Sequence, residues 1–138
     1  MIRLVVITDL DGTLLDQETY SYEASLPAIR RLLSLHIPLI LCSSKTSSEI
    51  VALWEELGLR DPFISENGGA IYLPPNYFRF PVQGARPKGP LETLELGTDI
   101  STLRGVLAET ARQCRVRIRS FGAMSPDEVS LLTGLSRN

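Results

Sequence analysis

The chain has 138 residues, of which 43% are hydrophobic and 22% are charged, and its formal net charge is −2 at pH 7. This length suits one ordinary domain, and this composition is typical of a globular protein rather than a disordered, collagen-like or coiled-coil one. Because the chain has no overall basic charge, we expect no nucleic acid and no membrane among its partners. A small diffusible molecule is the better expectation.

Targeting signals and cysteines indicate the compartment. The apolar runs at 4–7 and 37–42 are far shorter than the roughly 18 residues that a membrane helix needs. Asp9 follows the first run too soon for a signal peptide. Cys42 and Cys114 lack the spacing of a metal-binding pair, so we expect two free thiols in a cytoplasmic protein.

The first half of the chain alternates between apolar strand-like runs and amphipathic helices. The predicted strands are 2–8, 37–42 and 62–65, and the predicted helices are 25–35 and 47–57. The first strand is rich in β-branched residues, as expected for a strand buried on both faces. Such alternation indicates a parallel sheet, with ligands beyond the carboxyl ends of its strands.

The second half has a different texture. A strand-like piece at 70–73 leads into a stretch at 74–90 that is rich in proline and glycine, which we expect to be irregular or edge structure. The later pattern predicts a strand, a helix, a strand and a helix at 91–96, 101–113, 116–120 and 125–132. Ser125 and Glu128 form a capping-box pattern at the start of the last helix.

Two carboxylates, Asp9 and Asp11, follow the first strand and are followed by Gly12 and Thr13. In an extended chain, residues two apart share a side, so both acids can face one pocket. Such a pair can bind a divalent cation, and one acid can attack phosphorus while the other handles a proton. The alternative is a polar turn, which an isolated pair of acids would favour.

The acids belong to a longer motif. Residues 8–15 read TDLDGTLL, and this pattern directly after an apolar strand resembles the nucleophile loop of the haloacid dehalogenase superfamily of phosphatases. That superfamily has a Ser or Thr at the end of the next strand, where this chain has Ser43. The resemblance implies an α/β fold with a partial doubly wound parallel sheet as the core over 1–80, and an incomplete α+β cap over 81–138.

Further segments narrow the resemblance. Those that resemble the mannosyl-3-phosphoglycerate phosphatase family are 20–22, 37–39, 43–46, 66–72 and 132–136. Many relatives in the same subclass have Thr-Gly-Arg where this chain has Ser-Ser-Lys at 43–45. The resemblance implies a small phosphorylated sugar-glycerate as the substrate.

The resemblance also implies roles for single residues. Asp9 would attack the phosphate and form an aspartyl-phosphate, Asp11 would protonate the leaving alcohol and later activate water, and Ser43 would hydrogen-bond a phosphate oxygen. Mg²⁺ would be held by the Asp9 carboxylate and the Asp11 backbone carbonyl. The expected substrate-binding residues are Ser44, Lys45, Asn67 and Gly68.

Several of these assignments have alternatives. Lys45 lies at a predicted helix start, so it either binds an anionic substrate or is a surface side chain. The loop at 66–69 either lines the pocket rim or forms a tight hairpin turn. At and next to the predicted strand at 116–120, alternation would place Arg115, Arg117 and Arg119 on one face, which either recognises substrate from the cap or is solvated.

The chain departs from the family after the cap, where the family has a lysine and an acidic metal loop that this sequence lacks. The strands on one side of the first strand would also come from that later part, so 4–7 would lie at a sheet edge. Such an edge invites pairing with another chain, for example in a homodimer. We therefore expect either a fragment of a longer phosphatase or a non-catalytic binding or assembly module, with a related sugar phosphatase or phosphomutase as a third option.

Overall fold

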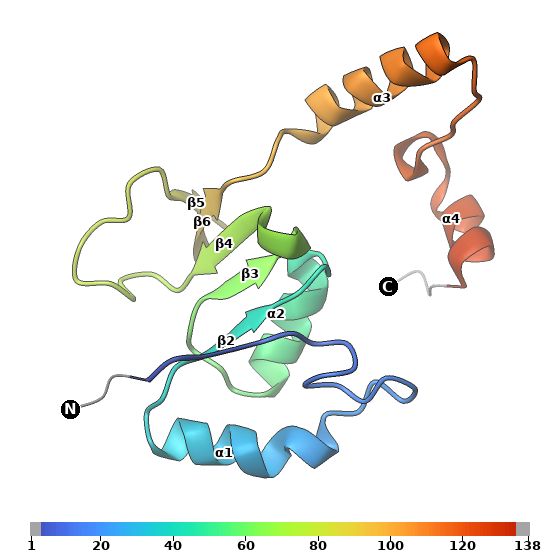
Figure 1. The fold of residues 1–138 in the computed structure, drawn as a ribbon. Helices are drawn as coiled ribbons and strands as arrows, with labels where there is room; N and C mark the ends of the chain where they lie inside the picture. Colours follow the sequence, from blue (N-terminus) through green and yellow to red (C-terminus); the bar gives the residue numbers. More distant parts are fainter. Residues whose placement is uncertain (1–3, 135–138) are drawn as a thin grey trace. The chain divides into compact units, whose positions relative to one another are not determined.

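The computed structural model describes residues 4–134, which divide between Gly97 and Thr98 into two compact units (Figure 1). The first unit holds a six-stranded sheet with the strand order β1-β2-β3-β4-β6-β5. The strands are β1 (Val6–Thr8), β2 (Leu39–Cys42), β3 (Phe63–Ser65), β4 (Ala70–Leu73), β5 (Arg86–Lys88) and β6 (Leu91–Glu95). The helices α1 (Leu26–Ser34) and α2 (Ser47–Glu56) connect the first three strands.

The sheet is mixed. Strands β1, β2 and β3 are parallel, as the alternation of strands and helices predicted. Strands β4, β6 and β5 join them in antiparallel pairs, beginning with the β3–β4 hairpin. The α/β fold class is confirmed, and the parallel half of the sheet is the half that carries the predicted motif.

The hydrophobic core lies between one face of the sheet and helices α1 and α2. Because side chains alternate along a strand, Leu39 and Leu41 of β2 share this face, and both are fully buried. They belong to the same cluster as Ile29 of α1 and Ile50 and Trp54 of α2. The core therefore anchors the crossover helices that lead into and out of β2.

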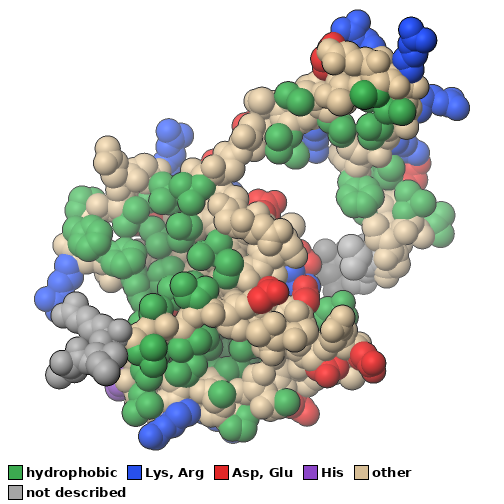
Figure 2. All heavy atoms as spheres, in the orientation of Figure 1, with side chains coloured by type: hydrophobic (Ala, Val, Ile, Leu, Met, Phe, Trp, Pro, Cys, Tyr) green, Lys and Arg blue, Asp and Glu red, His purple; other side chains and the backbone are tan. Residues whose placement is uncertain are grey.

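The first strand lies at the edge of the sheet, so the prediction that it is buried on both faces is wrong. Leu4, Val5 and Ile7 are 55%, 49% and 58% exposed. No strand of the described part of the chain pairs with the outer side of β1. The predicted sheet edge at 4–7 is therefore confirmed. Figure 2 shows that hydrophobic side chains gather on one face of the first unit.

Strands β5 and β6 lie beyond residue 80 but belong to the sheet of the first unit. Backbone pairing of Tyr72 with Thr93 and of Leu73 with Glu92 ties β6 to β4. The compact units therefore divide at residue 97 rather than at 80. The predicted boundary at residue 80 separates the core of the family from its cap, which is not the same as a division into compact units. That boundary therefore stays a prediction.

The second unit contains helix α3 (Ile100–Cys114), a short 3-10 turn at Phe121–Ala123 and helix α4 (Pro126–Thr133). The Asp99 carboxylate caps α3 by accepting hydrogen bonds from the amides of Ser101 (2.8 Å) and Thr102 (3.4 Å). The predicted capping box of α4 is confirmed, since Ser125 N donates to Glu128 Oε2 at 2.8 Å and Glu128 N donates to Ser125 Oγ at 3.3 Å. Residues 135–136 of the family-like segment lie outside the described residues.

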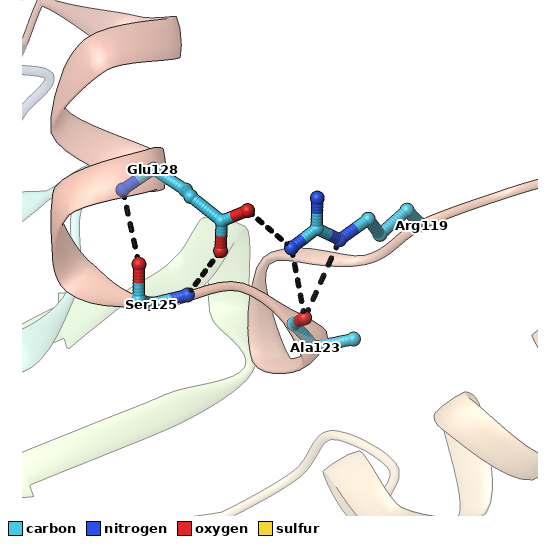
Figure 3. A network of polar contacts seen from close by, with 4 residues as sticks. All are labelled: Arg119, Ala123, Ser125 and Glu128. Carbon is cyan, nitrogen blue, oxygen red and sulfur yellow. Dashed lines mark hydrogen bonds and ion pairs between the residues drawn. The ribbon is translucent and has the colours of Figure 1, made fainter.

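The predicted strand at 116–120 is wrong. This segment is irregular, and Arg115 ends α3 with a left-handed φ of 56°. Instead of lying on a strand face, the Arg119 guanidinium donates to the Ala123 carbonyl and to the Glu128 carboxylate (Figure 3). An isolated strand cannot satisfy its backbone groups, and the side chain of Arg119 fixes this segment against α4 instead.

Both cysteines are free, as predicted, and no helix of the described part is long and apolar enough to cross a membrane.

Candidate functional site

The two acids lie in a tight loop directly after β1. The loop is anchored by Leu10, which is fully buried and whose carbonyl accepts hydrogen bonds from Thr13 N and Leu15 N. Asp9 is exposed, and its Oδ1 accepts a hydrogen bond from the Leu10 amide at 2.7 Å. Gly12 has a left-handed φ of 68°, a conformation that glycine adopts without strain. The leucine in the core therefore holds Asp9 at the surface, next to the end of β1.

Ser43 follows the next parallel strand. Its side chain is buried, its amide donates to the Ile64 carbonyl at 3.1 Å, and its Oγ accepts from the Lys45 amide at 3.3 Å. Helix α2 then begins in a capping box formed by Thr46 and Glu49. Because parallel neighbours end at the same sheet edge, Ser43 and Asp9 lie at the same edge, as predicted.

The turn after β3 is joined to the loop that contains Ser43. Glu66 N donates to the Lys45 carbonyl at 3.1 Å, and Asn67 N donates to the Ser43 carbonyl at 3.0 Å. Glu66, Asn67 and Gly68 all have left-handed φ values, of 52°, 54° and 96°. The segment is thus a tight turn between β3 and β4, and it also lies at the edge where the other two loops meet.

An ion pair connects the loop after β1 with the loop after β2. Lys45 Nζ lies 3.0 Å from Asp11 Oδ1, and the two side chains are 23% and 41% exposed. The hydrogen bond with Asp11 raises the pKa of Lys45, although partial burial opposes this shift. Lys45 is therefore a cation held inside the cluster of predicted site residues rather than a freely solvated side chain.

The sequence prediction missed Tyr20, whose ring centroid lies 5.4 Å from Lys45 Nζ. Its loop is closed by hydrogen bonds from Tyr20 N to the Asp16 carbonyl (3.0 Å) and from Asp16 N to the Ser21 carbonyl (2.8 Å). The Asp16 carboxylate also accepts from the Thr19 amide at 2.8 Å, and this bond lowers the pKa of Asp16. An Asp followed by a Thr three residues later is a turn signal that predicts this loop but not where the ring points.

Lys88 and the three arginines at 115–119 lie elsewhere. Lys88 is on β5, at the other end of the sheet from β1, and its Nζ lies 3.5 Å from Glu95 Oε1. Arg115, Arg117 and Arg119 belong to the second unit. The structure therefore brings together Asp9, Asp11, Ser43, Ser44, Lys45, Asn67 and Gly68 on three adjacent loops of the first unit.

The oxygen donors at this edge supply only part of a coordination shell for magnesium. In the described part of the chain, no three side chains of His, Cys, Asp or Glu cluster so that they could hold a metal ion. Mg²⁺ is commonly bound through one or two carboxylates, with waters and substrate phosphates completing its octahedral shell. The Asp9 carboxylate and the Asp11 carbonyl, two hard donors in one loop, fit an ion that is bound together with a phosphorylated substrate.

The residues of the three loops fall within one matched family region. The model of a family described as haloacid dehalogenase-like hydrolase matches residues 6–78, which include every predicted site residue. The chain belongs to this family.

Curated relatives are similar over nearly the whole chain. A glucosyl-3-phosphoglycerate/mannosyl-3-phosphoglycerate phosphatase from Methanococcoides burtonii is 42% identical over 131 residues, which are 95% of this chain and 48% of that protein. A mannosyl-3-phosphoglycerate phosphatase from Pyrococcus furiosus is 36% identical over 138 residues, which are 100% of this chain and 54% of that protein. The chain thus spans about half the length of these relatives.

Solved structures support the fold. A crystal structure from Thermoplasma acidophilum has a TM-score of 0.60 at 20% identity and covers 97% of this chain and 56% of its own. A haloacid dehalogenase-like hydrolase from Bacteroides thetaiotaomicron has a TM-score of 0.57 at 24% identity, over 81% of this chain and 38% of its own.

Proposed function

We propose that this chain carries the nucleophile half of a magnesium-dependent phosphomonoesterase that acts on a phosphorylated sugar-glycerate such as mannosyl-3-phosphoglycerate. The observation that carries the proposal is the meeting of three loops at one sheet edge, with Asp9 after β1, Ser43 after β2 and Asn67 after β3. The names of the curated relatives support the choice of substrate. The cytoplasmic location remains a prediction from the sequence.

The proposed reaction has two steps. An oxygen of the Asp9 carboxylate attacks phosphorus while the bond from phosphorus to the substrate's alcohol oxygen breaks, and Asp11 gives a proton to the departing alcohol. Water then attacks phosphorus, Asp11 takes a proton from the water, and the bond from phosphorus to the Asp9 oxygen breaks, which releases phosphate and restores the Asp9 carboxylate. In the structure Asp11 Oδ1 lies 3.0 Å from Lys45 Nζ, so the carboxyl group that exchanges the proton in both steps is held next to a cation.

The remaining residues bind the substrate. Ser43 and Ser44 supply hydroxyl donors, Lys45 supplies a cation, and the turn containing Asn67 and Gly68 forms the rim. When bound by the Asp9 carboxylate and the Asp11 carbonyl, Mg²⁺ would neutralise negative charge on the transferring phosphoryl group.

The test is phosphate release from a panel of sugar phosphates, with and without Mg²⁺, by the present chain and its Asp9→Asn variant. We expect Asp9→Asn to lower kcat at least about a thousandfold, because an amide cannot act as the nucleophile. The matched control is Asp99→Asn, which makes the same change at the cap of α3, where asparagine also caps well. Undiminished turnover in Asp9→Asn would refute the proposal.

A second candidate function is a non-catalytic binding or assembly module that forms a homodimer through β1. The observation that favours it is the exposure of Leu4, Val5 and Ile7 at an unpaired sheet edge of the described structure. A stable dimer without phosphate release would support this candidate over the first.

A further inference from the structure

We propose that Tyr20 is a positioning residue of this site: the face of its ring holds the Lys45 ammonium beside the Asp11 carboxylate, so that Lys45 presents a fixed cation to an anionic substrate. This inference rests on the proposed function, because it assigns Lys45 to the binding of a phosphorylated molecule.

Two partners restrain the Lys45 ammonium. Asp11 Oδ1 lies 3.0 Å from Nζ, and the Tyr20 ring centroid lies 5.4 Å from it, within the distance at which a ring face attracts a cation. The two partners come from the same loop, since Asp11 precedes Tyr20 by nine residues. A long, flexible side chain from another loop is thus held between two groups of the segment that joins β1 to α1.

The backbone of Tyr20 has an unusual conformation. Its φ of 56° is left-handed, which is rare for a bulky aromatic residue and persists only where the surroundings enforce it. The enforcing contacts are the hydrogen bonds of Asp16 to Thr19, Tyr20 and Ser21. A strained aromatic residue in a closed loop whose ring contacts Lys45 of the site indicates a constraint from the site.

The ring face, rather than the hydroxyl, makes the contact with Lys45. Phenylalanine keeps this face, whereas leucine has similar bulk without the ring's charge distribution. The pair Tyr20→Phe and Tyr20→Leu therefore separates the cation–ring contact from simple packing.

The experiment observes lysine side chains by NMR while inorganic phosphate is added to the 138-residue chain. The chain has two lysines, Lys45 and Lys88, so their ε-methylene signals can be assigned with Lys88→Arg. We expect phosphate to shift the Lys45 signal both in the unmodified chain and in Tyr20→Phe, and we expect the Kd for phosphate to be the same in the two proteins. In Tyr20→Leu we expect a more mobile Lys45 side chain and a Kd raised about two- to fivefold.

Lys88 is the internal control, because it contacts the Tyr72 ring at 5.6 Å and lies at the other end of the sheet. Its signal should be the same in all Tyr20 variants, which also shows that they fold. Three results would overturn the inference: phosphate does not shift Lys45 selectively, Tyr20→Leu matches the unmodified chain, or Tyr20→Phe behaves as Tyr20→Leu does. The proposed function is tested separately by the phosphate-release assay of Asp9→Asn. Undiminished release by that variant would refute the proposed function, whatever the lysine signals show.

Discussion

Asp61 lies outside the sequence motif and yet joins three parts of the first unit. Its Oδ2 accepts a hydrogen bond from the Leu39 amide at 2.9 Å, and its Oδ1 accepts from the Tyr77 hydroxyl at 2.8 Å. Its backbone carbonyl accepts from Trp54 Nε1 at 2.8 Å. Burial, followed by the bond to Asp61, raises the pKa of Tyr77 to about 12. One carboxylate therefore fixes the start of β2 and the loop after β4.

We predict that Asp61→Ala lowers the free energy of unfolding by about 2 kcal/mol, because hydrogen bonds to a charged group are lost and the Leu39 amide is left without its acceptor. Denaturant unfolding measures this change, with Glu55→Ala on the exposed side of α2 as the control. In an absorbance titration, the pKa of Tyr77 should fall but stay above 10, since burial is the larger cause of its shift. An unchanged pKa would contradict the assigned contact.

At the scale of elements, helix α4 depends on one carboxylate with two roles. Glu128 accepts from the Ser125 amide in the capping box and from the Arg119 guanidinium, and Arg119 also binds the Ala123 carbonyl (Figure 3). The hydrogen bond with Arg119 is the largest cause that lowers the pKa of Glu128 from 4.5 to about 2. The irregular segment before α4 and the first turn of α4 are thus linked through one side chain.

This link predicts how the second unit responds to acid. Because the pKa of Glu128 is lower in the folded state, its stabilising effect is complete above about pH 4.5 and is lost as the pH falls towards 2. We expect the helical signal of α4 to decline over this window and the decline to be reduced in Glu128→Gln. NMR titration of Arg119→Gln should give a Glu128 pKa between 2 and 4.5, since the Ser125 bond remains. A pKa that still lies near 2 in that variant would contradict the role of Arg119.

The local patterns predicted the elements well where hydrophobic periodicity and capping residues act within one segment. The helices at 25–35 and 47–57 and the capping box at Ser125 are examples. The pattern failed at 116–120, because a strand needs a partner that composition does not reveal. The motif placed Asp9 and Ser43 at the correct edge, whereas Tyr20 and Asp61 act through contacts between distant residues that no local pattern contains.

At the scale of the whole molecule, the first unit has a side that the described residues leave open. The edge strand β1 carries apolar residues, and an unpaired edge of this kind is a template for association. The curated relatives are about twice as long as this chain. Whether the edge pairs with a second copy can be measured directly.

We predict that the chain self-associates through β1 and that Ile7→Lys weakens this association about tenfold or more, because a lysine on an edge strand opposes pairing with a like-charged copy. Sedimentation over a range of protein concentrations measures the association. The control is Leu131→Lys, which makes a similar change at a residue of α4 that is 86% exposed. A monomer at all concentrations, or equal weakening by both variants, would count against the β1 interface.

The alternation of β2 has a further consequence for chemistry. Leu39 and Leu41 point into the core, so Cys42 lies on the opposite face of the sheet, together with Ile40 and with Ile64 of β3. The Cys42 thiol is half-buried there and is free. Its alkylation rate would therefore report whether another polypeptide shields this face, and the exposed Cys114 thiol would supply the reference rate within the same molecule.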